Sequence, residues 1–209
     1  MQSFLSTRIT YASLILLGTR KALARHLANA EVIYEYRSTE SPGPANQRVE
    51  HREGCLLFLD ALWDAINLRN DRQHFQQNLV MVEIPTFSER PVREAVLNAV
   101  SHRDYRHNGS IFVRHFPRKL IIESPGGFPP GITTENILWK QLPRNRRLAD
   151  SFAKCGLVER SGQGMDLMFE RCIREGKALP ILAEPTNTRL FLLSTARSKI
   201  RGSSVSWKP

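Results

Sequence analysis

The chain has 209 residues, 41% of them hydrophobic, and is therefore long enough to bury a sizeable core. Its 30 Lys and Arg residues outnumber its 20 Asp and Glu residues, which gives a formal net charge of +10 at pH 7. This excess favours an anionic partner such as a nucleotide or a nucleic acid. The apolar run at 11–17 is too short to span a bilayer, so we expect no membrane partner through this segment.

The three cysteines, Cys55, Cys155 and Cys172, are odd in number and far apart in the sequence. Their spacing indicates neither a disulfide framework nor a metal site, and the six histidines show no metal pattern either. We therefore expect structural thiols and a cytoplasmic location.

The first third of the chain is predicted to contain a helix, a strand and a second helix. The apolar segment 10–18 begins the first helical part, and 31–36 has the composition of a strand. Residues 38–47 are polar, contain two prolines and one glycine, and are typical of a linker. Apolar residues then recur at helical spacing over 54–68, which predicts the first core helix.

The most informative segment, 93–105, is predicted to form one helix with two chemically different faces, and Ser88 and Pro91 suit its first turn. One face is apolar and fit to pack on a sheet; it consists of Val92, Ala95, Val96, Ala99 and Val100. The other face is polar and consists of Glu94, Asn98, Ser101, His102 and Tyr105. Side chains four residues apart on a helix lie about 5–6 Å from each other. A carboxylate and a carboxamide held side by side can share Mg²⁺ or a nucleophilic water. A solvated helix face is the alternative.

Two glycine-containing loops follow a predicted hairpin of strands 110–116 and 119–123. The first contains Gly126, Gly127 and Gly131, and the second, Gly162-Gln163-Gly164, precedes a predicted helix at 166–175. Glycines at such places let main-chain N–H groups approach phosphates, particularly where a loop opens a helix. Each loop taken singly is equally typical of an ordinary turn. Segments 179–183 and 189–193 are predicted to close the sheet as a strand pair.

Taken together, the segments 93–105, 124–133 and 156–165 and the Arg144-Asn145 dipeptide resemble GHKL-type (Bergerat-fold) ATP-binding domains. They are similar in particular to the family named after a C-terminal domain of the RecG helicase, which is found in bacterial and archaeal transcriptional regulators. The resemblance implies an α+β fold, a two-layer α/β sandwich with a mixed sheet and helices on one face. It also implies that ATP and Mg²⁺ bind between the polar helix and the two glycine loops.

The resemblance also implies roles for single residues. Glu94 takes the position of the general base that activates water, and Asn98 that of the Mg²⁺-binding asparagine. The first glycine loop would lie beneath the base and ribose, and Gly162, Gln163 and Gly164 would meet the phosphates. The intervening segment 132–158 corresponds to a lid over the nucleotide, with Arg144 and Asn145 inside it. His102 would orient a hydrogen bond near the nucleotide or cap the helix face.

One position departs from the GHKL pattern. The wider GHKL proteins read adenine with an aspartate just before the first glycine loop. Here the nearest acidic residue is Glu123, and Ser124 follows it where Asp or Asn is expected. Glu123 and Ser124 are therefore candidate nucleotide-binding residues, while adenine selectivity and productive ATP turnover stay open.

The domain plan expected from these features has four parts. Residues 1–37 resemble the final portion of a Schlafen/AlbA-type DNA-binding domain, which precedes the GHKL domain in such regulators. Residues 38–48 form a linker, and 49–195 form the GHKL-type ATP-binding domain. Residues 196–209 form a polar, basic tail that we expect to be disordered.

Three functions remain open at this point. The first is an ATP-binding module of a DNA-binding transcriptional regulator, with DNA contacts through the flanking domain or the basic surface, and with a homodimer as a further option. The second is a slow ATPase with Glu94 as general base. The third is a degenerate scaffold that binds nucleic acid or protein without nucleotide.

Two other enzyme classes do not fit the sequence. His102-Arg103-Asp104 matches the start of a protein-kinase catalytic loop, but the kinase pattern needs Asn five residues after the Asp, and position 109 is Gly. A helicase motor is excluded because no Gly-x-x-x-x-Gly-Lys-Ser/Thr motif is present.

Overall fold

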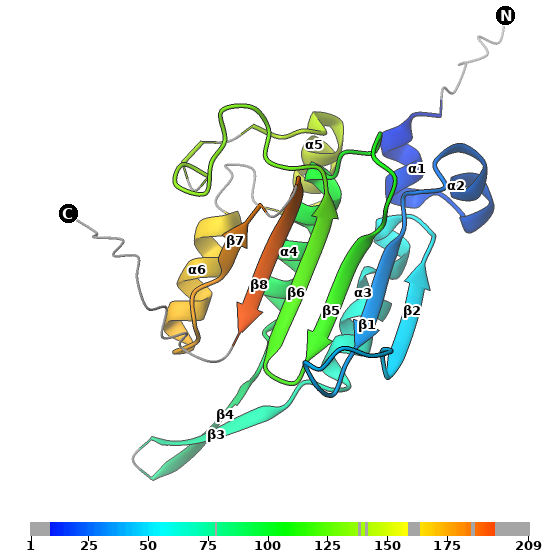
Figure 1. Cartoon of the computed structure of the whole chain (residues 1–209). Coiled ribbons are helices and arrows are strands. Elements are labelled where there is room, and N and C mark those ends of the chain that lie inside the picture. Colours follow the sequence, from blue (N-terminus) through cyan, green and yellow to red (C-terminus); the bar gives the residue numbers. More distant parts are fainter. Residues whose placement is uncertain are drawn as a thin grey trace, which may run out of the picture.

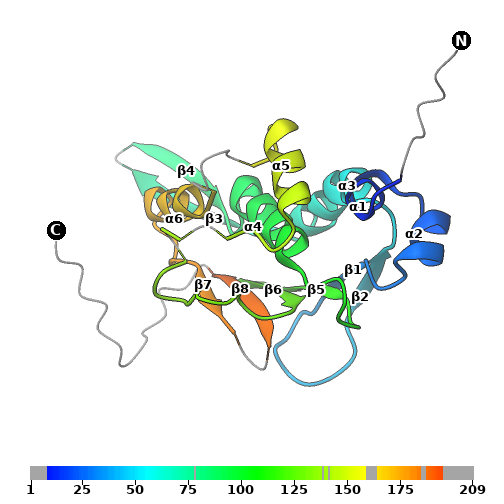
Figure 2. The same cartoon turned by 90° about the horizontal axis from the view of Figure 1, so that it is seen from above.

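The computed structural model describes residues 9–77, 79–137, 139–140, 142–158, 164–184 and 187–194. These residues form two layers, a six-stranded sheet and a layer of helices that covers one face of it (Figures 1 and 2). This arrangement confirms the predicted α+β two-layer sandwich.

The elements follow one another in the order α1 (Tyr11–Leu17), α2 (Arg20–His26), β1 (Val32–Tyr36), β2 (Gln47–His51), α3 (Cys55–Asn67), β3 (Arg72–Gln77), β4 (Val80–Pro85), α4 (Glu89–His102), β5 (Ile111–Phe116), β6 (Lys119–Pro125), α5 (Arg146–Lys154), α6 (Gly164–Arg174), β7 (Ile181–Ala183) and β8 (Thr188–Ser194). The predicted core helix at 54–68, the hairpin at 110–123, the helix at 166–175 and the closing strand pair are all confirmed within a few residues.

The sheet is mixed, with strand order β2-β1-β5-β6-β8-β7. β1 runs parallel to β5, and the other neighbouring pairs are antiparallel. β1 and β2 belong to this same sheet, so the polar segment 38–47 connects two adjacent strands of one layer. The derivation of residues 1–37 from a DNA-binding domain stays a prediction, and the basic tail lies outside the described residues.

The core lies between the sheet and α4, which occupies the middle of the helix layer (Figure 2). β6 and β8 each alternate between buried and partly exposed residues, as strands covered on one face do. The predicted apolar face of α4 is buried, and Leu97 is buried as well (0% exposed). Leu97 is buried because α3, α5 and α6 pack around α4 in addition to the sheet.

Two details of α4 differ from the prediction. The helix ends at His102, because Arg103 has a non-helical ψ of 139°, so Tyr105 is not on the polar helix face. The Tyr105 hydroxyl instead donates to the main-chain oxygen of Val100 at 2.9 Å. Ser88 is the N-cap residue, yet its side chain makes no capping hydrogen bond. It donates to Glu175 (2.5 Å) after the end of α6 and so ties the two helices together.

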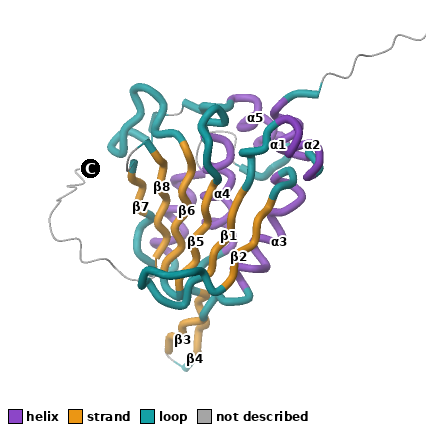
Figure 3. Tube along the Cα trace, turned by 45° about the vertical axis from the view of Figure 1, so that its right-hand side comes forward, coloured by secondary structure: helices purple, strands orange, loops and turns teal. Residues whose placement is uncertain are grey.

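The elements that were not predicted include β2, β3, β4 and α5. β3 and β4 form a separate antiparallel hairpin that projects beyond the end of the main sheet (Figures 1 and 3). α5 lies within the expected lid segment and rests on the C-terminal end of α4. In the described part of the chain, no helix combines the length and the apolarity needed to cross a membrane.

Candidate ligand-binding cavity

A cavity of about 560 Å³ lies between α4, α5 and the segment that connects β6 to α5. Ligand pockets of small molecules typically measure about 300–1,000 Å³. The polar and charged residues that line the cavity are Glu94, Asn98, Ser101, His102, Lys140, Arg146, Asp150 and Arg189. The apolar ones are Pro129, Ile132, Ile137, Leu142, Pro143, Ala149, Phe152, Ala153, Val158 and Met165. The size and the mixed lining suit a ligand with both an apolar and a charged part.

The helical spacing of Glu94, Asn98 and His102 brings all three to the cavity, as the sequence predicts. The amide oxygen of Asn98 and Nδ1 of His102 are buried and have no hydrogen-bond partner among the described residues. Glu94 also lines a smaller cavity of about 110 Å³ between α4 and α6, which contains Arg90, Arg171 and Arg174. A buried acceptor without a partner costs free energy, so the polar end of the cavity is suited to a ligand that supplies one.

His102 is neutral in this environment. Burial, followed by the nearby positive charges of Arg189 and Arg144, lowers the pKa of His102 to about 3. A neutral imidazole offers one donor and one acceptor. His102 can therefore accept or donate a hydrogen bond within the cavity without adding charge to it.

Arg189 is one of the polar lining residues that sequence reasoning missed, together with Lys140, Arg146 and Asp150. It is only 2% exposed, and its Nε and Nη1 have no hydrogen-bond partner among the described residues. Burial, then repulsion from Arg144, lowers the pKa of Arg189 to about 10, so the side chain is still protonated at neutral pH. Every second residue of β8 is buried, namely Arg189, Phe191 and Leu193. This alternation is the sequence signal that could have shown that Arg189 points inward.

The glycines of the first loop do not line the cavity. Gly126 has a φ of +92°, and a Cβ added there would lie 2.6 Å from the Cβ of Asp104. A Cβ on Gly127 would overlap the carboxylate of Glu184. Gly131 also has a positive φ, of +81°. These glycines are required by the turn and by close packing, and the same loop presents Pro129 and Ile132 to the cavity.

Arg144 and Asn145 hold the lid against the end of α4. Arg144 forms an ion pair with Asp104 (3.1 Å) and donates to the main-chain oxygen of Gly127 (2.5 Å). The side-chain amide of Asn145 donates to the main-chain oxygens of Ser101 (2.9 Å) and Arg103 (2.8 Å). The last carbonyls of a helix have no partner within the helix. The dipeptide therefore positions the cavity wall, and neither of its residues lines the cavity.

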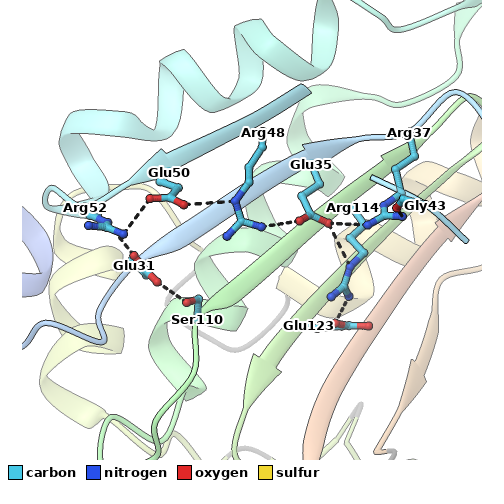
Figure 4. A network of polar contacts seen from close by, with 10 residues as sticks. All are labelled: Glu31, Glu35, Arg37, Gly43, Arg48, Glu50, Arg52, Ser110, Arg114 and Glu123. Atoms are coloured by element: carbon cyan, nitrogen blue, oxygen red, sulfur yellow. Dashed lines mark hydrogen bonds and ion pairs between the residues drawn. The ribbon is translucent and has the colours of Figure 1, made fainter. Parts of the chain in front are cut away.

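Glu123 and Ser124 lie on opposite faces of β6. Ser124 is buried and donates to the main-chain oxygen of Ala99 at 2.9 Å, which ties the strand to α4. Glu123 pairs with Arg114 on the face of the sheet without helices, beside a network of charges centred on Glu35 (Figure 4). Glu123 is therefore separated from the cavity by the sheet.

The second glycine loop can be placed only in part. Gly162 and Gln163 lie outside the described residues, whereas Gly164 begins α6 and Met165 lines the cavity. The first turn of α6 therefore reaches the cavity wall, and a helix N-terminus carries a partial positive charge.

The described residues contain no group of three or more His, Cys, Asp or Glu side chains that could hold a metal ion by themselves. Mg²⁺ usually keeps several waters and takes its remaining ligands from one or two side chains and from substrate phosphates. The buried, partnerless amide oxygen of Asn98, four residues from Glu94, fits such a shared site.

Comparisons with known proteins point to the same kind of domain. Residues 108–192 match the family model described as "Putative ATP-dependent DNA helicase recG C-terminal", which supports an ATPase-like domain in this part of the chain. The match begins after α4 and so does not include Glu94 or Asn98. The case for their roles therefore rests on the geometry of the cavity.

The fold is similar to the crystal structure of the DIP2311 protein from Corynebacterium diphtheriae, with a TM-score of 0.73 and 33% sequence identity. The alignment covers 79% of this chain and 35% of that one, so this chain spans about a third of the length of that protein. A search of curated proteins gave no match.

Proposed function

We propose that the cavity binds a nucleoside triphosphate together with Mg²⁺, with ATP as the ligand expected from the family description. In this proposal the chain is a nucleotide-binding module of a DNA-binding transcriptional regulator. The observation that carries it is that Glu94 and Asn98 line one wall of a 560 Å³ cavity, where the Asn98 amide oxygen is buried and has no hydrogen-bond partner in the part of the chain that the structure describes.

The charges around the cavity support a polyphosphate ligand. Lys140 and Arg146 line the cavity and are exposed at its rim, where they can meet a mobile, highly charged group. The first turn of α6 lines the same cavity at Met165, and helix N-termini favour phosphate oxygens. The Asn98 amide oxygen would bind Mg²⁺ or one of its waters, and the ion would neutralise phosphate charge.

The lid gives the nucleotide a route to flanking parts of the protein. α5 packs against both α4 and α1, the N-terminal helix that precedes the sheet. Closure of segment 132–158 over phosphates would shift α5 and with it the contact to α1. We expect ATP·Mg²⁺ to protect this segment from proteolysis, and unchanged cleavage would contradict the closure.

Slow hydrolysis is the second candidate, because Glu94 lines the same cavity as Asn98. A carboxylate within hydrogen-bond reach of a water beside the terminal phosphate can act as general base. Glu94 would then remove the proton from the attacking water, and the Mg²⁺ beside Asn98 would stabilise the charge that develops on the phosphate.

Calorimetric titration tests the binding proposal. ATP and GTP are titrated, with and without Mg²⁺, into the wild type, Asn98→Ala and the control Asn67→Ala, which changes an exposed asparagine on α3. We expect Mg²⁺-dependent binding that is weakened in Asn98→Ala and unchanged in the control. No binding of either nucleotide to the wild type would contradict the proposal. Salt-sensitive DNA binding without a nucleotide effect would then favour the scaffold function.

A further inference from the structure

Arg189 is a buried cation in the cavity wall, and its guanidinium group is only partly hydrogen-bonded at most within the described residues. Two of its guanidinium nitrogens, Nε and Nη1, are buried and have no partner among the described residues. The one carboxylate that raises its pKa, Glu184, is exposed at the surface, whereas Arg144 adds a second positive charge nearby. A buried, incompletely paired charge is costly to keep, and an acceptor on a ligand would offset that cost.

The guanidinium is also held in place. The ring of Phe128 lies 5.2 Å from its carbon and the ring of Phe191 lies 5.8 Å away, both within the range of a cation–π contact. Arg189 is opposite Ser124 in the register between β8 and β6. The two aromatic neighbours and the pairing of β8 with β6 give the guanidinium donors a defined direction, so they can discriminate between ligands by geometry.

Arg189 differs in its burial from the two cationic side chains that we expect to bind the phosphates. Lys140 and Arg146 are exposed at the rim, and the first turn of α6 reaches the cavity at Met165. Arg189 is buried instead and comes from strand β8, and neutral His102 lines the same cavity. A triphosphate bound by the rim would therefore direct its base towards Arg189.

We propose that Arg189 selects the base of the nucleotide and favours a 6-oxopurine, as in guanine, over adenine. The O6 and N7 atoms of guanine are both acceptors, and an arginine side chain donates to the two of them together. Adenine places an amino group, itself a donor, at the 6-position, and the guanidinium has no acceptor to offer it. This inference rests on the proposed function, namely that the cavity binds a nucleoside triphosphate.

Titrations of GTP, ITP and ATP with Mg²⁺ into the wild type test the inference first. ITP keeps O6 and N7 but lacks the 2-amino group of guanine, so it reports on the edge that Arg189 would contact. We expect GTP and ITP to bind about 5- to 160-fold more tightly than ATP, since one such bidentate contact discriminates by about 1–3 kcal/mol. Equal or tighter binding of ATP would overturn the inference and leave the proposed function intact.

A change of specificity provides the second test. Glutamine can donate to N7 and accept from the 6-amino group of adenine, so Arg189→Gln should reverse the preference in favour of ATP. The control is Arg146→Gln, which changes an exposed arginine of the same cavity. It should weaken all three nucleotides by a similar factor and leave their ratios unchanged.

The remaining outcomes distinguish the two proposals. If Arg189→Gln folds with an unchanged melting temperature and weakens all three nucleotides equally, Arg189 contacts a phosphate and base selection is wrong. If the variant does not fold, the wild-type ratios of GTP, ITP and ATP still decide. If no triphosphate binds to the wild type, the proposed function fails and base selection fails with it.

Discussion

Arg144 and Asp104 join the lid to the end of the central helix, with the guanidinium nitrogen Nη1 3.1 Å from the carboxylate oxygen Oδ2. Asp104 is 5% exposed, and its main-chain N–H donates to the oxygen of Pro125 at the start of the first glycine loop. Through its carboxylate and its main-chain N–H, Asp104 therefore connects three parts of the cavity wall, namely the end of α4, the glycine loop and the segment just before α5.

The first prediction concerns this carboxylate. A hydrogen bond from Arg106, followed by the charges of Arg106 and Arg144, holds the pKa of Asp104 well below its usual range. A depressed carboxyl pKa stabilises the fold above the unfolded-state pKa, about 3.9, and this contribution is lost as the pH falls below that value. Urea unfolding of Asp104→Asn should show reduced stability at pH 7 and a shallower loss of stability below pH 4 than the wild type. An identical pH profile would show that the ion pair contributes nothing.

The second prediction concerns His102. Its pKa is lowered to about 3, so the unfolded chain takes up a proton near pH 6.5 while the folded chain does not. Folding stability should therefore decrease as the pH falls from about 6.5 towards 4, by at most about 1.4 kcal/mol per pH unit from this group. His102→Gln should remove that part of the slope in urea unfolding measured across this range. If the slope is unchanged in His102→Gln, a group other than His102 causes the pH dependence of stability.

The third prediction concerns the first glycine loop. Gly126→Ala adds a Cβ at a φ of +92° that would meet Asp104, whereas Gly156→Ala adds one at a φ of +69° with nothing within 4 Å. Both changes strain the main chain, at about 1–2 kcal/mol, and only the first adds a clash. Gly126→Ala should therefore lower the free energy of unfolding by more than Gly156→Ala, its matched control. Equal losses would indicate that the loop moves away from Asp104 without cost.

The fourth prediction separates binding from hydrolysis. Glu94→Gln keeps the size of the side chain and removes its ability to accept a proton. If the chain hydrolyses ATP or GTP, this variant should bind the triphosphate with a similar Kd and lose about 10²- to 10⁴-fold in turnover. Phosphate release under single-turnover conditions is the measurement. Turnover at the wild-type rate would exclude Glu94 as the general base.

Much of the fold could be predicted because its periodicities are strong. The apolar face of α4 repeats at helical spacing, and β5 and β6 are separated by two residues, so α4 and the β5–β6 hairpin can be predicted from the sequence. α5 was missed because in its nine residues only Leu148 and Phe152 are buried. The β3–β4 hairpin lies outside the main sheet and has no alternation imposed by the core.

The cavity was harder to predict than the fold. Adjacent strand residues point to opposite faces, so Glu123 and Ser124 could not both face the ligand, and the carboxylate turned away from it. Arg189 was overlooked because a charged residue in a strand normally faces water. Its inward direction follows from its spacing of two and four residues from the apolar Phe191 and Leu193 on the same strand.

Crystals grown with Mg²⁺ and non-hydrolysable analogues of GTP and ATP would show directly whether the cavity binds a nucleotide. We expect a nucleotide between α4 and the lid, with the Asn98 amide oxygen bound to Mg²⁺ or to one of its waters. An empty cavity at saturating nucleotide, or a nucleotide bound elsewhere on the chain, would contradict this expectation.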